Sequence, residues 1–465
     1  MEFVLCFTIF LGQNLISGSE FDAKTKERIL KAIWAIVLFL FVSSVQAGEL
    51  TLQQALELAE KNATELQLLD AEHTLATATH QRTAQAFLPK ISADATWLRA
   101  DSSLINDIPI PSLSLPPRIV YEDFGPADGS IRGIQVIQPV FNADAFKARK
   151  QADRGVEARR LSYQWGRQLM RFQVAGHYYA VAVRQADEKA ARMALEAARE
   201  AWEMADGAYR EGLVSKLDVV RADAEVAAGR ARVKTAESDV REARVNFATL
   251  LGLSPQEQII LINDFPEPIP PATEPVLSEK RSDLLAQEAK HEAAAAGLDK
   301  AKARWLPRVN LLARQQWLDG DEPFDLYADG WLVALHLQWT LFDGLGRQGE
   351  IAEARARKTL AHVELEAARR AVAREQELAV SDWRAAWSAW QASGRALKAA
   401  GRALTLARGQ YKEGLGNMTD LLATQAGLYQ RRLEYSRYQH HVLLASMNYY
   451  LRYGNDPLKA LPGDF

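Results

Sequence analysis

The chain has 465 residues with a formal net charge of −3, and 48% of its residues are hydrophobic. Without an excess of basic residues it has no surface suited to a phosphate backbone, which argues against a nucleic-acid partner. Much of the hydrophobic content is alanine, which favours long helices with small side chains over a single thick core.

The first 47 residues have the pattern of an export signal. A basic stretch (residues 24–31) precedes an apolar stretch (residues 32–42) and Val45-Gln46-Ala47, a small-residue cleavage site. A membrane anchor is the alternative, but a bilayer-spanning helix needs about 20 apolar residues. We therefore expect residues 1–47 to be removed, together with Cys6, the only cysteine. No later stretch predicts a membrane helix, so only strands could enter a membrane.

The first half of the remaining chain, residues 48–262, predicts two strands followed by a long helical hairpin. Between Ile91 and Trp97 apolar and polar residues alternate, as in a half-buried strand. In the second strand the apolar face cannot be assigned, because Gln135 and Gln138 lie on opposite faces. The predicted elements are a helix over 50–86, strands over about 90–100 and 131–141 with a loop over 101–130 between them, a long helix over 142–209 and a return helix over 215–251.

The long helix of the first half carries a heptad pattern. Apolar residues, several of them aromatic, recur every seven positions from Trp165 to Met193, as in a coiled-coil seam. Asn142 is a suitable N-cap, and at 1.5 Å per residue the helix is about 100 Å long. An ordinary globular domain does not need such a rod.

The second half, residues 282–465, follows a Pro-rich linker (263–281) and predicts the same elements in the same order. Residues 331–341 give the clearest strand alternation, and Asp343 is a suitable N-cap for the second long helix. The predicted elements are a helix over 282–305, strands over 308–318 and 330–342 with a loop over 319–329, a long helix over 343–411 and a return helix over 417–452.

Matching motifs indicate that the two halves are copies of one unit. Tyr209-Arg-Glu-Gly-Leu-Val-Ser-Lys-Leu-Asp-Val-Val220 returns without a gap as Tyr411-Lys-Glu-Gly-Leu-Gly-Asn-Met-Thr-Asp-Leu-Leu422. Phe87-Leu-Pro returns as Trp305-Leu-Pro, and Pro139-Val-Phe-Asn142 returns as Thr340-Leu-Phe-Asp343. Similarity over about 200 residues indicates a duplicated domain rather than a solenoid.

The strands carry tryptophans that favour a membrane interface, namely Trp97, Trp317, Trp331 and Trp339. They could instead form the core of a soluble sheet, but the neighbouring helices are not patterned to cover one. Four strands cannot close a barrel, and an open edge in lipid leaves backbone groups unpaired. Three copies giving twelve strands are therefore preferred to two giving eight, which would leave little lumen.

Together these motifs resemble the TolC family of outer-membrane efflux and secretion channels. The resemblance covers the chain from Leu50-Thr-Leu-Gln-Gln-Ala-Leu-Glu-Leu-Ala59 to the last helix. It implies a mainly α fold with a membrane β part: each chain of a homotrimer supplies one third of a 12-stranded β-barrel and of a long α-helical barrel. It also implies outer-membrane localisation in a Gram-negative-type bacterium, with the helical part in the periplasm.

The resemblance further implies a passive exit duct of a tripartite efflux or type I secretion system. Its expected partners are outer-membrane lipid, a periplasmic adaptor (membrane fusion) protein and an inner-membrane RND or ABC-type pump. The alternative that we keep is a periplasmic coiled-coil adaptor or structural scaffold. No enzyme motif, cofactor site or metal site is predicted. His73 and His80 share a helix face, but they lack the cysteines or carboxylates that a metal site needs.

In the TolC family the two helical turns form the periplasmic tip, where the channel narrows and the adaptor docks. The matching residues here are Gly212, Leu213, Val214 and Ser215, and Gly414, Leu415, Gly416 and Asn417. The matching gate residues are Asp218, Tyr411 and Asp420. In the family member that best matches the first turn, the aspartate at position 218 bonds to a tyrosine, matching Tyr411, and to an arginine that Gly416 replaces here.

A structural role competes with the gate role at these positions. Ser215-Lys-Leu-Asp218 and Asn417-Met-Thr-Asp420 resemble capping boxes, with the acid satisfying backbone amides at a helix start. The two roles are compatible, because a cap at a pore tip can also face the lumen. A second acidic position of the family's constriction is occupied here by Ala423, so a single acidic ring is expected.

Overall fold

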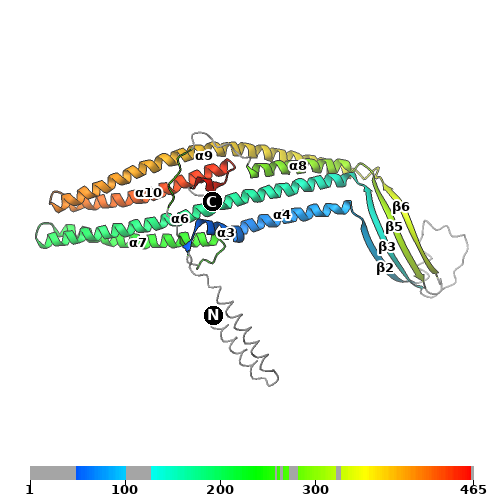
Figure 1. The fold of residues 1–465 in the computed structure, drawn as a ribbon, viewed down its shortest axis with the longest axis horizontal. Coiled ribbons are helices and arrows are strands. Elements are labelled where there is room, and N and C mark those ends of the chain that lie inside the picture. Colours follow the sequence, from blue (N-terminus) through cyan, green and yellow to red (C-terminus); the bar gives the residue numbers. More distant parts are fainter. Residues whose placement is uncertain are drawn as a thin grey trace, which may run out of the picture.

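The computed structural model describes residues 49–100, 127–256, 259–261, 265–271, 281–320 and 326–461. The expected export signal lies outside these residues, as does most of the predicted loop between the first two strands. The described chain is a long array of helices with a four-stranded sheet at one end (Figure 1). The shorter elements are β1 (Glu49–Leu50), α3 (Leu52–Asn62), α4 (Thr64–Arg82), η1 (Thr83–Ala86), β4 (Ile260–Leu261), α8 (Ser282–Ala303) and η2 (Pro457–Ala460).

Two helices set the length of the molecule. α6 (Ala143–Arg210) has 68 residues and α9 (Gly346–Lys412) has 67. At 1.5 Å per residue each is about 100 Å long. Both run from the sheet to the opposite end, where α7 (Lys216–Leu250) and α10 (Met418–Arg452) fold back beside them (Figure 1). The sheet and the two helical turns therefore lie at opposite ends of the molecule.

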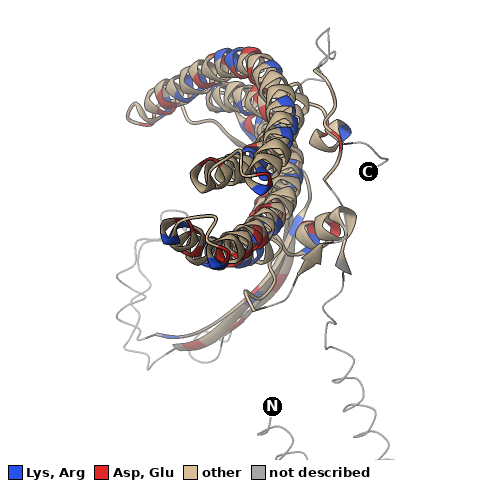
Figure 2. Cartoon of the chain, turned by 90° about the vertical axis from the view of Figure 1, so that its left-hand side faces the viewer, with Lys and Arg blue, Asp and Glu red and all other residues tan. Residues whose placement is uncertain are grey.

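The two repeats interlock instead of forming separate domains. α6 of the first repeat packs on α7 of its own repeat and on α8 and α10 of the second. Seen from the end that carries the turns, the helices lie side by side along an arc (Figure 2). Many of the buried contact residues are alanines, which let helix axes approach closely; Ala191, Ala201 and Ala205 of α6 are fully buried. The chain has the shape of a curved wall.

The heptad pattern describes the packing of α6 only in part. Tyr179 is buried as a seam requires, whereas Met193 is exposed. The buried face of α6 is wider than one seam because this helix contacts helices from both repeats. In α9, Trp383 is buried against Tyr449 of α10.

The sheet has the order β2-β3-β5-β6, and all neighbouring strands are antiparallel. The strands are β2 (Lys90–Ala100), β3 (Ala127–Phe141), β5 (Arg308–Gly320) and β6 (Leu326–Gln338). β3 and β6 therefore begin four residues before the predicted positions 131 and 330. Residues with loop composition extend the ladder because backbone pairing does not depend on side-chain polarity. β6 also ends at 338 instead of 342, because Gln338 pairs with Arg308, the first residue of β5.

The starts of the two long helices differ from the prediction. Asn142 is the N-cap of α6, but its side chain makes no capping hydrogen bond. α9 starts at Gly346, three residues later than predicted, after Leu345 in a left-handed conformation with φ 71°. Asp343 still satisfies this helix start, because its carboxylate accepts hydrogen bonds from the backbone N–H and from Nε of Arg347 at 3.1 and 2.9 Å.

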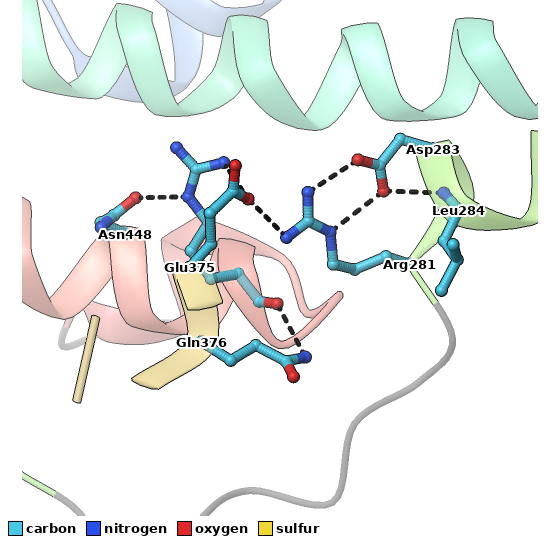
Figure 3. A network of polar contacts seen from close by, with 7 residues as sticks. Arg281, Asp283, Leu284, Glu375, Gln376 and Asn448 are labelled. Atoms are coloured by element: carbon cyan, nitrogen blue, oxygen red, sulfur yellow. Dashed lines mark hydrogen bonds and ion pairs between the residues drawn. The ribbon is translucent and has the colours of Figure 1, made fainter. Parts of the chain in front are cut away.

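An ionic network around the buried Arg281 joins α8, α9 and α10 (Figure 3). The Arg281 guanidinium, only 4% exposed, binds Asp283 at the start of α8 and Glu375 of α9. Glu375 also binds Arg452 at the end of α10, at 3.0 Å. Arg281 stacks over Trp165 of α6 with 4.7 Å between guanidinium carbon and ring centre. Four helices from both repeats are thus held together at one level.

Candidate functional site

The two helical turns have the same backbone geometry. Gly212 and Gly414 have φ of +77° and +73°, a conformation that glycine adopts without steric cost. After each glycine, Leu213 or Leu415 donates its N–H to the carbonyl five residues earlier, at 2.9 and 2.8 Å. This is the bonding pattern of a Schellman helix end. Both glycines therefore end a helix, as their sequence positions suggest.

Apolar side chains protrude at the tip that the two turns form. Leu213 is 72% exposed and Leu415 is 77% exposed, and Leu217 and Val220 of α7 are exposed beside them. Val214 is half-buried, whereas Ser215 and Asn417 are exposed. Exposed apolar side chains grouped at one end of a protein indicate a contact surface for another molecule.

The predicted capping boxes form in neither turn as expected. Asn417 caps α10, since its Oδ1 accepts the backbone N–H of Asp420 at 2.8 Å. The Asp420 carboxylate, however, accepts the side-chain amide of Asn417 at 2.7 Å instead of a backbone amide. At the first turn Ser215 makes no capping bond, and its hydroxyl donates to Asp218 at 3.4 Å. Both acids are therefore bonded to the cap side chain, and Asp420 remains exposed.

The hydrogen bond that the resemblance implies between Asp218 and Tyr411 is not present. The Tyr411 hydroxyl is buried and has no hydrogen-bond partner among the described residues. Burial, and secondarily the Asp218 charge, raise the pKa of Tyr411. Asp218 is instead oriented by Ser215 and by Arg221, whose guanidinium lies 3.8 Å from the carboxylate. Asp218 thus influences Tyr411 through its charge, but its carboxylate pairs with Arg221 and not with the tyrosine.

Arg221 also connects the two helical hairpins. Its Nη1 donates to Oγ1 of Thr419 in α10 at 3.0 Å. Sequence reasoning missed this residue, although its position three residues after Asp218 places it on the same helix face. Further along the hairpins, Arg408 of α9 binds Glu200 of α6 at 2.6 Å. Polar bonds from both α7 and α9 thus hold the hairpins together near the tip.

Gly416 occupies a crowded position in the second turn. A Cβ atom added there would lie 3.3 Å from Cβ of Gln410 and from the backbone nitrogen of Tyr411. A larger residue therefore requires small shifts of the turn. Below it, Ala201 and Ala205 of α6 and Met418 and Leu421 of α10 form a buried apolar cluster. The packing at the tip brings both repeats together directly behind the turns.

Another polar contact joins α6 and α10 farther from the tip. The Asp187 carboxylate accepts a hydrogen bond from the Ser436 hydroxyl at 2.8 Å, and both are buried. Desolvation raises the pKa of Asp187. One turn away, a ring nitrogen of His440 lies 3.2 Å from the Gly176 carbonyl, and burial lowers the pKa of this histidine. These groups fix the register of the two helices, because a shift would leave buried polar atoms unpaired.

At the other end of the molecule, the sheet has one mostly apolar face. The strand register places Trp97, Trp317 and Trp331 on this face, and Trp339 follows β6 with the same parity. Trp97 and Trp331 are 76% and 78% exposed. The apolar side of β3 could not be assigned from the sequence. The register places Ile134 and Val136 on the apolar face of the sheet and Gln135 on the opposite face. No described helix covers this apolar face.

Most aromatic residues at the borders of this face lie at one of two levels. Trp97, Trp317 and Tyr327 are near the free hairpin ends, whereas Trp305 and Trp339 are near the helices, where Trp339 Nε1 donates to the Trp305 carbonyl at 3.1 Å. Between the two levels, β6 exposes Trp331, Val333, Leu335 and Leu337 on this face. Trp331 thus lies within the apolar band and not at its border.

In the described part of the chain, no group of three or more His, Cys, Asp or Glu residues could hold a metal ion. His80 lies 2.7 Å from Asp153 of α6, so its ring contacts a carboxylate of the neighbouring helix. None of the described helices combines the length and the apolar character needed to cross a membrane.

Comparison with protein families gives one extended match. The model described as outer membrane efflux protein matches residues 55–253 and 276–454, which is most of the chain. The chain belongs to the outer membrane efflux protein family. The family consists of outer-membrane proteins, so the chain is located in the outer membrane. Membership confirms the resemblance to TolC-type channels.

One curated relative and several solved structures are similar to this chain. Protein CyaE of Bordetella pertussis is 31% identical over 288 residues, which are 59% of this chain and 58% of that protein. The Campylobacter jejuni CmeC outer membrane channel has a TM-score of 0.75 at 15% identity, over 87% of this chain and 85% of CmeC. Vibrio cholerae VceC has a TM-score of 0.73 at 18% identity, over 87% and 96%. These structures confirm a mainly α fold with a β part.

Proposed function

We propose that three copies of this chain form an outer-membrane channel that crosses the periplasm. The observation that carries the proposal is the four-stranded sheet, which has one uncovered apolar face and two strands, β2 and β6, paired on one side only. Unpaired strand edges are not tolerated in lipid, so further strands must come from other copies. Three copies would give twelve strands and a barrel with a lumen.

The curvature of the helical array supports the same assembly. The described helices follow an arc with the sheet continuing one end of it (Figure 2). Three such arcs would close into a hollow α-helical cylinder below the barrel. We infer that the channel acts as a passive exit duct of a tripartite efflux or type I secretion system, powered by an inner-membrane RND or ABC-type pump.

The tip is the proposed docking and gating end. Leu213 and Leu415 offer exposed apolar contacts to a periplasmic adaptor, and Asp218, Tyr411 and Asp420 lie directly behind them. Trp97, Trp317 and Trp339 are the proposed interface aromatics, with Trp331 in the lipid-facing band. The alternative of a soluble adaptor or scaffold does not account for an uncovered apolar sheet face.

The test is to purify the mature chain from outer membranes and to record its conductance in planar bilayers. We expect a heat-modifiable trimer that conducts ions once it is opened. A monomer that is released with the periplasmic fraction and does not conduct would contradict the proposal and favour the scaffold.

A further inference from the structure

One ion pair crosses the middle of the polar face of the sheet. Nη2 of Arg314 in β5 donates to Oδ2 of Asp94 in β2 at 3.2 Å, although β3 lies between these strands. Asp94 stands opposite Gly133 of β3, and Arg314 stands opposite Gln135. Because directly opposed residues point to the same side, all four side-chain positions share one face. The pair therefore spans three strands.

Gly133 provides the space in which the two side chains meet. A Cβ atom on Gly133 would lie 3.3 Å from Oδ2 of Asp94 and 3.4 Å from Nη2 of Arg314. These separations are at the limit of van der Waals contact, so a larger side chain would push the pair apart. The glycine thus suits a contact between β2 and β5 over the intervening strand.

The face that carries this pair is the one that turns away from the lipid. A charged side chain exposed to lipid near the bilayer centre is strongly unfavourable. The opposite face carries the apolar band around Trp331 and Leu335. The side chains of Arg314 and Asp94 are 33% and 45% exposed, so both reach solvent while they bind each other. In the proposed channel they line the lumen.

We propose that Asp94 and Arg314 set the ion selectivity of the membrane-spanning part of the channel. This inference rests on the proposed function. Each copy brings one carboxylate and one guanidinium, so the lumen carries charges of both signs that cancel at short range. Removing either partner leaves a ring of like charges inside low-dielectric walls, which focus the field on passing ions. The intact pair leaves the exit open to solutes of either charge.

The experiment measures the reversal potential of purified trimers in planar bilayers under a potassium chloride gradient. All variants carry Asp420→Asn, so that the tip carboxylate does not mask the effect. Asp94→Asn should shift the reversal potential towards the chloride equilibrium potential, and Arg314→Gln towards that of potassium. The double variant should return close to the parent. The matched control is the Arg132–Asp319 pair, 3.5 Å apart on the apolar face, whose neutralisation should leave the reversal potential unchanged.

A second measurement tests the same assignment in case the charge variants fail to assemble. In a Cys6→Ser background, Asp94→Cys should react with a charged methanethiosulfonate reagent and lose conductance. Ala93→Cys, the neighbouring residue on the opposite face, should keep its conductance. The inference is wrong if trimers conduct but neither single substitution changes their reversal potential. It is also wrong if the reagent blocks the cysteine variant at position 93 but not the one at 94. Neither result would contradict the proposed channel function. A parent protein that never conducts would contradict the proposed function itself.

Discussion

At the scale of single residues, the cation beside Asp218 is not the one that the resemblance implies. Gly416 stands where the resemblance places an arginine. The sequence therefore predicts that Asp218 lacks its ionic partner. The structure supplies Arg221 from α7, which approaches Asp218 and bonds to Thr419 across the hairpins. Tyr411 is left without a hydrogen-bond partner in the described chain.

Substitution of Arg221 by Ala should loosen the tip. The change removes the bond to Thr419 and leaves Asp218 without its cation, so the hairpins lose one of the polar contacts between them. We expect a higher resting conductance of the purified trimer in planar bilayers. Arg210→Ala is the control, because Arg210 pairs only with Asp206 of its own helix in the described structure. A resting conductance equal to that of the parent would show that Arg221 does not hold the tip.

Asp420 allows the cap and the constriction roles to be separated. Its carboxylate bonds to the Asn417 amide but is exposed to solvent. If the three carboxylates face the pore, Asp420→Asn should weaken block by multivalent cations, because the ring of charge disappears while the amide keeps an acceptor for Asn417. The measurement is current block by a trivalent cation applied from the periplasmic side. Unchanged block would mean that the Asp420 carboxylate only orients the Asn417 cap.

At the scale of elements, the spacing of apolar residues predicted the type and order of the main helices and strands, except that the predicted helix over 50–86 is divided into α3, α4 and η1. The alternation in β6 was clear because every second residue from Trp331 to Leu337 is apolar. The apolar face of β3 was not predictable, because glutamines occur on both of its faces, and only the pairing with β2 and β5 assigned it. Strand ends were missed where backbone pairing continues through polar residues.

The two faces of β6 should respond differently to charge. Leu335 lies in the apolar band opposite Leu311, whereas Leu332 lies opposite Arg314 on the polar face. Leu335→Lys should destabilise the membrane-inserted trimer by about 2–4 kcal/mol, because it exposes a charge to lipid. Leu332→Lys should cost much less, since it faces water in the lumen. The comparison is the urea midpoint for unfolding from lipid vesicles, and equal losses would contradict the assignment of the faces.

At the scale of the whole molecule, the duplication in the sequence predicted two equal units. The packing of the helices of one unit against those of the other could not be predicted from the sequence. α6 carries contacts to both repeats. Arg281 joins α8 to α9, Glu375 extends the network to α10, and Arg281 stacks on Trp165 of the first repeat. Such long-range contacts depend on how helices wrap, which a periodic pattern does not specify. The bonds of Arg221 and Arg408 were missed for the same reason.

The two half-paired strands at the sheet edges have a genetic consequence. In a ring of three, every copy would join both neighbours, one through β2 and the other through β6. A copy with one damaged edge therefore breaks one junction, and a single broken junction opens the whole ring. When such a copy is made beside the normal chain and the two mix at random, the share of fully normal rings falls as the cube of the normal fraction. Edge lesions should consequently behave as dominant, whereas lesions that prevent folding altogether should be recessive.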